Sequence, residues 1–471
     1  MATYNSFNPK HSTKDIKASH TKLLHLASDS IQGGAESVFR NTILQTLQFK
    51  NYHIFVASCD NQNNIPKEVK AFVKLDDWGD YPKWRGAFKY VFNFKNYFLL
   101  KKFLFTQKPD IIHTQNYLSR LSPSVLFALK AYKKHFPHTK LIYTQHGFGS
   151  CANGGFYNYA KKCICEECIG RIKWRIAWKK CDRRGRIHSL LKAIRSLFYQ
   201  EGFLSEKTLF DKVICVGKFQ LQKHKEDGWD ISKLLHLTNP IEMTFYNPNV
   251  TLQDKQNLIV FYGRLSPEKN VSSLITAFAN LIKYPQFSNY KLLIIGNGDD
   301  EKHCIELARE LIEHPPSPHY EFLGRRTPKE IKDILSRAKL SVLPSLLQET
   351  FGLTIVESML ASCPALVPDI SEQNITARHF GGFIFTDLTD SLVQILNEYD
   401  TYFNDFMHKR AKKLPTLFDN AYLKELVRIY GGGGDNVVYI LILHSFFSPF
   451  SLSLPSFSAL HTLPTRQEYA A

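Results

Sequence analysis

Two carboxylates stand eight positions apart in the segment SLLQETFGLTIVES, at Glu349 and Glu357. The apolar, glycine-containing residues between them predict the start of a buried helix, with Glu349 in the loop before it. Eight residues of helix rise about 12 Å, which is comparable with the reach from a ribose across a diphosphate to a sugar. Carboxylates accept hydrogen bonds from vicinal hydroxyls, so the pair suits both ends of a nucleotide sugar. The alternative is a helix N-terminal charge at Glu349 and a surface acid at Glu357.

Two cations lie where they could face those acids. The segment NLIVFYGRLSPEKNV places Arg264 directly after a predicted strand and Lys269 at the mouth of the next helix. Arginine as a two-pronged donor and lysine as a point charge can hold a diphosphate. Free amides at the helix start near Gly352 would favour the same anion from the opposite side. The alternative is that both cations form a solvated rim of the sheet.

Glycines follow two other predicted strands. In SDSIQGGAESVFRNTI, Gly33 and Gly34 precede a helix that begins at about residue 35, where backbone amides could approach an anion closely; a tight turn without a ligand is the alternative. The segment KLLIIGNGDDE ends in Gly296 and Gly298, but Glu301 occupies the third glycine place of a dinucleotide fingerprint. No GxxxxGK[ST] loop occurs either. The sequence therefore argues against nicotinamide or flavin binding and against a P-loop enzyme.

The elements that must position these residues belong to the α/β class. A chain of 471 residues exceeds what one hydrophobic core usually supports. Short apolar runs alternate with helix-type stretches, which indicates parallel sheets buried on both faces, with ligands beyond the carboxyl ends of the strands. Two doubly wound domains facing each other across a cleft are therefore expected. The first series of strands is 22–27, 53–58, 110–114, 140–144 and 212–216, and the second is 257–263, 291–296, 320–324, 340–344, 364–368 and 382–385.

The segments FYGRLSPEKNV, IIGNGDDE, FLG, VLPS and ETFGLTIVE, in this order and spacing, resemble the retaining GT-B glycosyltransferases called glycosyl transferases group 1, or family 4. The first half is similar through QGGAE, DIIHTQN, YTQHGF and NPIE. The resemblance covers about residues 20–430 and implies a GT-B fold with two Rossmann-like domains. It also implies transfer of a sugar from a nucleotide-sugar donor, a UDP-sugar being expected, with retention of anomeric configuration.

The resemblance implies a role for each matching residue. In such enzymes Glu349 would face the donor sugar and Glu357 would hold the nucleotide ribose, while Arg264 and Lys269 would bind the diphosphate. His146, in YTQHGF, matches a histidine that points toward the donor sugar, although a lone histidine is more often a core or turn residue. The expected catalytic residues are Glu349, His146, Arg264 and Lys269, and the other expected donor-binding residues are Gly33, Gly34, Gly263, Arg325, Phe351, Gly352, Leu353 and Glu357.

The expected chemistry requires stabilisation of a leaving group. Breaking a glycosyl phosphate bond develops negative charge on the departing diphosphate, so fixed cations and amides aimed at it lower the barrier. Arg264, Lys269 and helix amides could supply that charge, and no DxD element stands in a suitable position. We therefore expect neither a metal ion nor another cofactor in the reaction.

Five cysteines cluster in a predicted insertion, residues 150–190, which follows His146 closely. Thiolates at short spacing can close a tetrahedral zinc site. The spacing here is irregular, so free or redox-labile thiols are the favoured alternative to a structural zinc site. The five are Cys151, Cys163, Cys165, Cys168 and Cys181.

The positive charge is concentrated in one half of the chain. Residues 1–250 carry a surplus of 20 Lys and Arg over Asp and Glu, whereas the remainder has a deficit of 3. The partner could be a nucleic acid, an anionic membrane or a phosphorylated substrate. Residues 81–108 hold seven basic and no acidic residues among many aromatic ones. A core helix with a solvated basic edge would explain them, but docking on an anionic membrane that carries a lipid-linked acceptor is favoured. No nucleic-acid recognition module accompanies the charge.

The expected organisation follows from these patterns. Residues 1–20 would be a disordered start, 21–245 an acceptor-side domain, 246–430 a domain that binds the nucleotide sugar, and 431–471 a tail foreign to the family. The first twenty residues do not resemble a cleavable signal, and no apolar run before residue 436 approaches a membrane span. The expected location is cytoplasmic, peripheral on the inner face of the cytoplasmic membrane.

The tail begins with four glycines, Gly431 to Gly434. If their codons form a guanine run, slippage there would make the tail an out-of-frame product. Sequencing the coding DNA tests this hypothesis, which a sequence without such a run would contradict.

The leading functional hypothesis is extension of a surface glycan, such as lipopolysaccharide, capsule or a lipid-linked oligosaccharide. A nucleotide-sugar epimerase of the same architecture would instead convert free nucleotide sugar without an acceptor. A basic nucleic-acid-binding protein would show steeply salt-dependent affinity for DNA or RNA.

Overall fold

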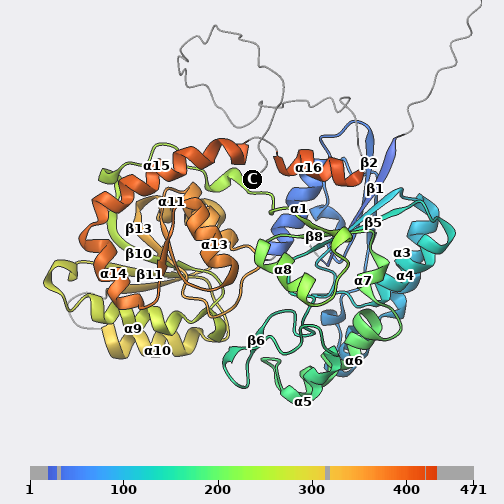
Figure 1. Cartoon of the computed structure of the whole chain (residues 1–471), viewed down its shortest axis with the longest axis horizontal. Helices are drawn as coiled ribbons and strands as arrows, with labels where there is room; N and C mark the ends of the chain where they lie inside the picture. The colour runs from blue at the N-terminus through green and yellow to red at the C-terminus, as the bar shows by residue number, and fades with distance from the viewer. Residues whose placement is uncertain (1–19, 29–32, 313–318, 419–420, 432–471) are drawn as a thin grey trace, which may run out of the picture.

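The computed structural model describes residues 20–28, 33–312, 319–418 and 421–431. Two wholly parallel sheets form the centres of two lobes that lie side by side, each covered by helices (Figure 1). The expected α/β class with two doubly wound units is confirmed. The predicted disordered start, except its last residue, and the predicted tail beyond residue 431 lie outside the described residues.

The first lobe is built on a seven-stranded sheet in the order β3-β2-β1-β4-β5-β8-β9. Its central strands are apolar because helices cover both faces; Leu23, Leu24 and Leu26 are fully buried. The edge strands β3 and β9 were not predicted, since each is only three or four residues long. The strands are β1 (Thr21–Leu26), β2 (Tyr52–Ser58), β3 (Ala71–Lys74), β4 (Ile111–Gln115), β5 (Lys140–Gln145), β8 (Lys212–Cys215) and β9 (Leu234–His236).

Helices of the first lobe connect successive strands. Helix α1 (Gly34–Thr46) follows β1, and α3 (Phe94–Gln107) packs beside α4 (Ser124–His135) on one flank of the sheet (Figure 1). The remaining helices are α2 (Lys83–Val91), α5 (Ile176–Lys179), α6 (Arg186–Ser196), α7 (Glu206–Leu209) and α8 (Lys218–Glu226), with a short 3-10 turn η2 (Trp78–Asp80) and a π-helical turn η4 (Leu197–Glu201).

The second lobe contains a six-stranded parallel sheet in the order β12-β11-β10-β13-β14-β15. Its core is continuous from the strands into the flanking helices, and Ile259, Val260 and Phe278 are buried within it. The strands are β10 (Gln256–Tyr262), β11 (Lys291–Ile295), β12 (Tyr320–Gly324), β13 (Ala338–Val342), β14 (Ala365–Pro368) and β15 (Phe383–Phe385). The helices are α9 (Val271–Leu281), α10 (Glu301–Ile312), α11 (Pro328–Arg337), α12 (Leu353–Leu360), α13 (Ser371–Phe380), α14 (Leu388–Asn397) and α15 (Tyr399–Phe418), with the 3-10 turn η8 (Pro267–Lys269).

The last described helix, α16 (Ala421–Tyr430), returns to the first lobe (Figure 1). Leu426 and Tyr430 are buried against the first sheet, together with Leu23 and Ile54. The Tyr430 hydroxyl lies 2.7 Å from Nδ1 of the buried His113 on β4. Because α15 packs on the second lobe, the chain crosses between the lobes twice.

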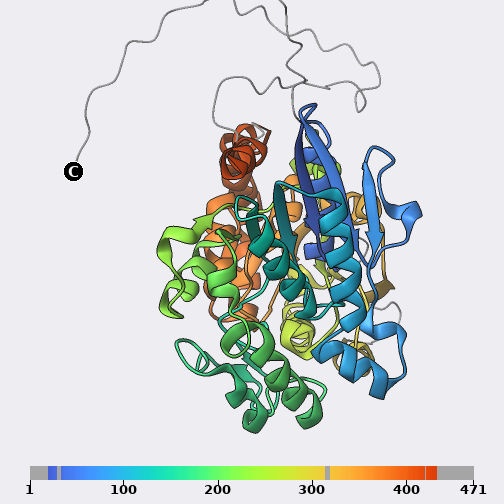
Figure 2. The ribbon, with the colours of Figure 1, turned by 90° about the vertical axis from the view of Figure 1, so that its right-hand side faces the viewer.

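The predicted insertion forms a projection at the end of the first lobe opposite α16 (Figures 1 and 2). It contains an antiparallel pair of two-residue strands, β6 (Tyr157–Asn158) and β7 (Cys163–Ile164), followed by α5 and α6. A buried ion pair between Lys173 and Asp227 attaches it to the end of α8. Glu166 accepts from Lys223 at 2.7 Å and from Gln348 of the second lobe at 2.8 Å, so the insertion contacts both lobes.

Candidate active site

The loops after β10 and β13 bring the predicted cations and acids together. Arg264 and Lys269 follow β10, and Glu349 follows β13, the strand that pairs with β10. A Cβ on Gly296 would stand 1.8 Å from the carbonyl oxygen of Gly263. Glycine at that position therefore lets the chain after β11 pass directly beside the chain after β10, and the two loops leave the sheet at the same edge.

Three of the four predicted catalytic residues line one cavity of about 110 Å³ at this edge: Arg264, Lys269 and Glu349. Lys269 donates to Oε1 of Glu349 as an ion pair. Gly263 and Gly352 line the same cavity, and so do Tyr262, Ser345, Thr354 and Gln373, which the sequence did not single out.

Helix α12 begins at this cavity. Gly352, its N-cap, has a φ of +83°, a left-handed conformation that strains any residue with a side chain. The first amides of α12 have no partners within the helix, and the helix dipole places partial positive charge at this end. The cavity therefore combines two side-chain cations, a carboxylate and a helix N-terminus.

Arg264 is held by a residue that the sequence analysis overlooked. Glu268, in η8, is fully buried, and its Oε1 accepts from Nη2 of Arg264 at 3.2 Å. Oε2 of Glu268 has no hydrogen-bond partner among the described residues. The sequence carries one indication of this role, because Glu268 stands between the two expected phosphate-binding cations in RLSPEK.

Glu357 lies inside α12 and contacts β10. Its Oε2 accepts from the hydroxyl of Tyr262 at 3.2 Å. Burial raises the pKa of Glu357 to about 7, although the bond from Tyr262 opposes the shift. The carboxyl is thus poised to change its charge near neutral pH.

The first lobe approaches this site from the other side. A Cβ on Gly34 would lie 3.2 Å from Cδ1 of Leu353, so Gly34 at the start of α1 lies beside the start of α12. His146 follows β5, and its backbone carbonyl accepts from the Thr350 hydroxyl at 3.0 Å. Its Nε2 lies 3.0 Å from Oε1 of Gln115, and burial lowers the pKa of the imidazole to about 4.

Arg325 and Phe351 lie outside the cavity lining, as do Gly33, Gly34, Leu353 and Glu357. Arg325 is exposed after β12 and donates from Nε to Oδ1 of Asn297 at 2.9 Å. Phe351 is buried, and its carbonyl accepts from Thr376 at 2.7 Å, which fixes the loop before α12. Their predicted contact with a donor remains a prediction.

The five thiols of the insertion do not form a metal site in the described part of the chain, where no group of three or more His, Cys, Asp or Glu side chains is placed to hold an ion. Cys151 and Cys168 are buried neighbours that share one small apolar cluster. Cys181 is buried in a second cluster, and Cys163 is exposed on β7. A structural zinc site on these thiols, and its alternative of free thiols, therefore stay predictions.

Residues 243–398 match the family model of the glycosyl transferases group 1. The matched segment, about a third of the chain, is of the group 1 glycosyltransferase type. The match covers the loops after β10 and β13 and all of α12, so it includes the cavity described above.

Curated relatives resemble this chain over limited lengths. An uncharacterised glycosyltransferase of Methanocaldococcus jannaschii is 26% identical over 175 residues, which are 36% of this chain and 42% of the relative. The phosphatidyl-myo-inositol mannosyltransferase of Mycobacterium leprae is 30% identical over 113 residues, 24% of this chain and 28% of the relative. The chain thus spans less than half the length of these relatives.

Solved structures are similar over most of this chain. Anabaena HepE in complex with UDP and glucose aligns with 88% of this chain and all of its own, with a TM-score of 0.60 and 15% identity. The lipopolysaccharide outer core galactosyltransferase WaaB aligns with 87% of this chain and 99% of its own, with a TM-score of 0.53 and 16% identity. The fold is GT-B, as expected.

None of the described helices combines the length and the apolar composition needed to cross a membrane.

Proposed function

We propose that this group 1 glycosyltransferase moves a sugar from a UDP-sugar to a membrane-bound surface glycan with retention of configuration. The observation that carries the proposal is the single cavity lined by Arg264, Lys269, Glu349 and the start of α12. Such a site matches a diphosphate flanked by hydroxyl-bearing sugars. In support, HepE has been solved with UDP and with UDP-glucose.

Each group has a part in the proposed reaction. Arg264, Lys269 and the first amides of α12 bind the diphosphate and stabilise its charge as the bond to the sugar breaks. Glu349 then exchanges Lys269 for hydroxyls of the donor sugar, and Glu357 accepts from the ribose. The positive charge comes from the chain itself, so the proposal needs no metal ion. Residues 246–430, apart from α16, supply the donor site and residues 21–245 the acceptor side.

His146 completes the site from the acceptor side. Its low pKa keeps the imidazole neutral at physiological pH, so one ring nitrogen is a donor and the other an acceptor. The Thr350 hydroxyl ties the backbone of His146 to the loop that carries Glu349. We propose that a neutral His146 donates a hydrogen bond to a donor-sugar hydroxyl.

An exposed aromatic surface on the first lobe supports a membrane-bound acceptor. Eleven of the sixteen large apolar side chains that are exposed in the described structure lie within residues 84–98 and 172–203. We call these eleven the aromatic face. They are Trp84, Phe88, Phe94, Phe98, Ile172, Trp174, Trp178, Ile187, Leu190, Ile194 and Phe203.

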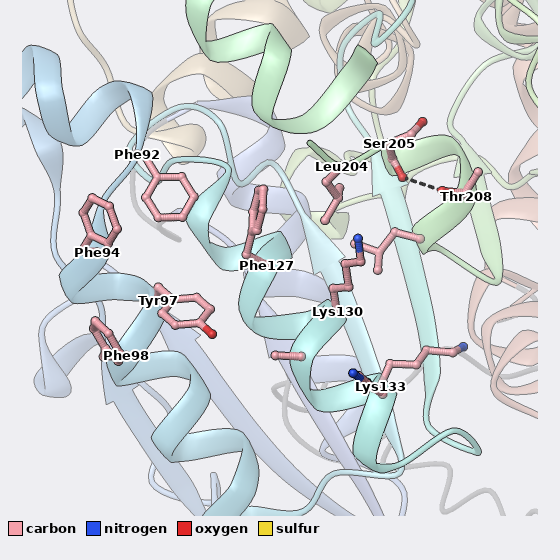
Figure 3. Close-up of a pocket in the computed structure, with 13 residues that line it drawn as sticks. Phe92, Phe94, Tyr97, Phe98, Phe127, Lys130, Lys133, Leu204, Ser205 and Thr208 are labelled. Atoms are coloured by element: carbon pink, nitrogen blue, oxygen red, sulfur yellow. Dashed lines mark hydrogen bonds between the residues drawn. The ribbon is translucent and has the colours of Figure 1, made fainter. Parts of the chain in front are cut away.

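A pocket of about 850 Å³ opens beside this face between α3, α4 and α7. Figure 3 shows the rings of Phe94, Tyr97, Phe98 and Phe127 along it, with Lys130 on α4. Lysine beside exposed aromatic rings suits the boundary between anionic headgroups and acyl chains. The acceptor we propose is therefore a glycolipid, such as lipopolysaccharide, a capsule precursor or a lipid-linked oligosaccharide.

The experiment is thermal unfolding of the full chain with a panel of nucleotide sugars. A true donor binds only the folded chain and raises its Tm. Lys269→Ala should remove that rise, whereas Lys302→Ala, a change at a side chain 90% exposed on the same lobe, should keep it. If no nucleotide sugar raises the wild-type Tm, the proposal is wrong.

Conversion of the donor without any acceptor would favour an epimerase, and steeply salt-dependent RNA or DNA affinity would favour a nucleic-acid-binding protein.

A further inference from the structure

A second cavity, of about 390 Å³, adjoins the proposed donor site on the acceptor side. The insertion, α6 and η2 of the first lobe line it, together with Arg264 and Glu268 of the second lobe. Arg264 lines both cavities, so a group bound in the second one would lie next to the donor diphosphate.

This cavity is strongly basic. Four of its lining residues from the first lobe are cations, and one, Asp182, is an acid. Asp182 pairs with Lys192 at 2.7 Å and with Arg184 at 3.1 Å, which holds the pKa of its carboxyl well below the usual range despite burial. Arg183 reaches Asp299 of the other lobe at 3.2 Å. The fourth cation, Arg195, has no carboxylate partner among the described residues.

Arg195 is an uncompensated charge at the wall of the cavity. Arg195 is only 5% exposed. Its Nη1 donates to the Leu118 carbonyl at 3.1 Å, and its Cζ lies 3.9 Å from the centre of the Tyr90 ring. Its buried Nε has no hydrogen-bond partner among the described residues. A buried cation without an anion is costly, so a fold that retains one is prepared for an anionic ligand.

The other walls of the cavity suit a sugar. Trp78 lines the same cavity, and its buried Nε1 also lacks a hydrogen-bond partner among the described residues. Tyr157 and Tyr159 of the insertion also line the cavity, and the apolar face of a pyranose can pack on such aromatic rings. The cavity thus presents unused hydrogen-bond donors together with aromatic surface.

We infer that this cavity binds an acidic sugar residue of the acceptor, with its carboxylate or phosphate on Arg195. The inference rests on the proposed function for the identity of the neighbouring donor site, and it adds the charge of the acceptor. A guanidinium binds either anion through two parallel hydrogen bonds. The insertion is then a selectivity element, because it supplies Arg183, Arg184 and both tyrosines.

Binding of three small probes to the full chain tests this inference. Glucuronate, glucose 6-phosphate and glucose are titrated in the presence of UDP and followed by saturation-transfer NMR. We expect at least one anionic probe to bind at least about tenfold more tightly than glucose. A hydrogen bond to a charged group strengthens binding by about this factor over a hydrogen bond between neutral groups. Glucuronate and glucose 6-phosphate separate a carboxylate site from a phosphate site.

Variants assign the selectivity to Arg195. Arg195→Met retains length and packing without charge and should reduce the preference for the anionic probe at least about tenfold. Arg195→Lys should retain part of the preference for the anionic probe. Arg186→Met, at an exposed position at the start of the same helix, should leave it unchanged. Equal binding of the three probes by the wild type, or an unchanged preference in Arg195→Met, would overturn the inference.

The same titrations separate this inference from the proposed function. UDP binding to each variant is measured alongside probe binding. Intact UDP binding with no anionic preference would contradict only the acidic acceptor, whereas absence of UDP binding in the wild type would contradict the donor site itself.

Discussion

Lys269 and Glu349 form an ion pair across the cavity between the chain after β10 and the loop before α12. Both side chains are about three-quarters buried, at 23% and 26% exposed. A diphosphate entering this cavity would replace the carboxylate as the partner of Lys269 and release Glu349 toward the sugar. The pair therefore keeps both groups in position before the donor arrives.

Removal of Lys269 should abolish transfer and spare the fold. We expect Lys269→Met to reduce kcat at least about a hundredfold, because one charge-stabilising donor to the leaving group is lost. A partly exposed ion pair contributes little stability, so the Tm should change by only a few degrees. Steady-state kinetics with the identified donor measure the effect, with Lys302→Met as the matched control. Full activity of Lys269→Met would contradict the assigned role.

Donor affinity should depend on pH through Glu357. Its pKa is raised to about 7 by burial, so the carboxyl is neutral below that pH and ionised above it. Only the ionised form accepts hydrogen bonds at both oxygens. We expect the Kd for UDP to rise as pH falls from 8 to 6, approaching tenfold per unit below the pKa.

Glu357→Gln provides the control for that pH dependence. It should bind UDP weakly at every pH, with a flat profile over the same range. A wild-type profile as flat as that of the variant would exclude titration of Glu357 as the cause. The same carboxyl affects stability in the opposite sense: its pKa is raised above the unfolded value, so the stability it contributes at low pH is lost as pH rises through 7.

Sequence patterns predicted the sheets because strands buried on both faces are continuously apolar. They also placed Arg264, Lys269 and Glu349 at one edge, since adjacent parallel strands end together. The role of Glu268 was not predicted, because local sequence does not show that an acid in a short turn is fully buried. The burial of Arg195 was not predicted for a similar reason. Its helix looks amphipathic, and only the packing of Tyr90 and Leu118 shows that its charge is enclosed.

The path of α16 could not be read from the sequence either. Its apolar spacing predicts a buried face, but that face would suit either lobe. The contact of Tyr430 with His113 joins residues 317 positions apart, and no local pattern encodes such a pairing.

Helix α16 should stabilise the lobe to which it returns. Leu426 is fully buried against the first sheet, so Leu426→Ala should lower the free energy of unfolding by about 2–5 kcal/mol through a cavity. Urea unfolding followed by circular dichroism measures this change. Arg428→Ala, at a side chain 72% exposed on the same helix, should stay within about 0.5 kcal/mol of wild type. Equal stabilities of the two variants would mean that α16 is not firmly packed.

Membrane binding should depend on the aromatic face and on anionic lipid together. Phe94 and Phe98 are 68% and 64% exposed at the pocket between α3 and α4. Lys130 and Lys134 line the same pocket and have no acidic partner among the described residues. The double variant Phe94→Glu, Phe98→Glu should bind phosphatidylglycerol vesicles at least about tenfold more weakly, because each ring loses up to about 1.5–3 kcal/mol of burial in the bilayer.

Vesicle sedimentation measures that binding, and UDP binding serves as the internal control. Tyr284→Glu places the same new charge at a ring 45% exposed on the second lobe, so it should leave vesicle binding unchanged. Pure phosphatidylcholine vesicles should bind the wild type weakly, since the lysines then lack their anionic partners. Equal binding to both lipids would leave no role for those lysines. Equal loss in both variants would mean that added charge, rather than loss of the aromatic face, weakens the interaction.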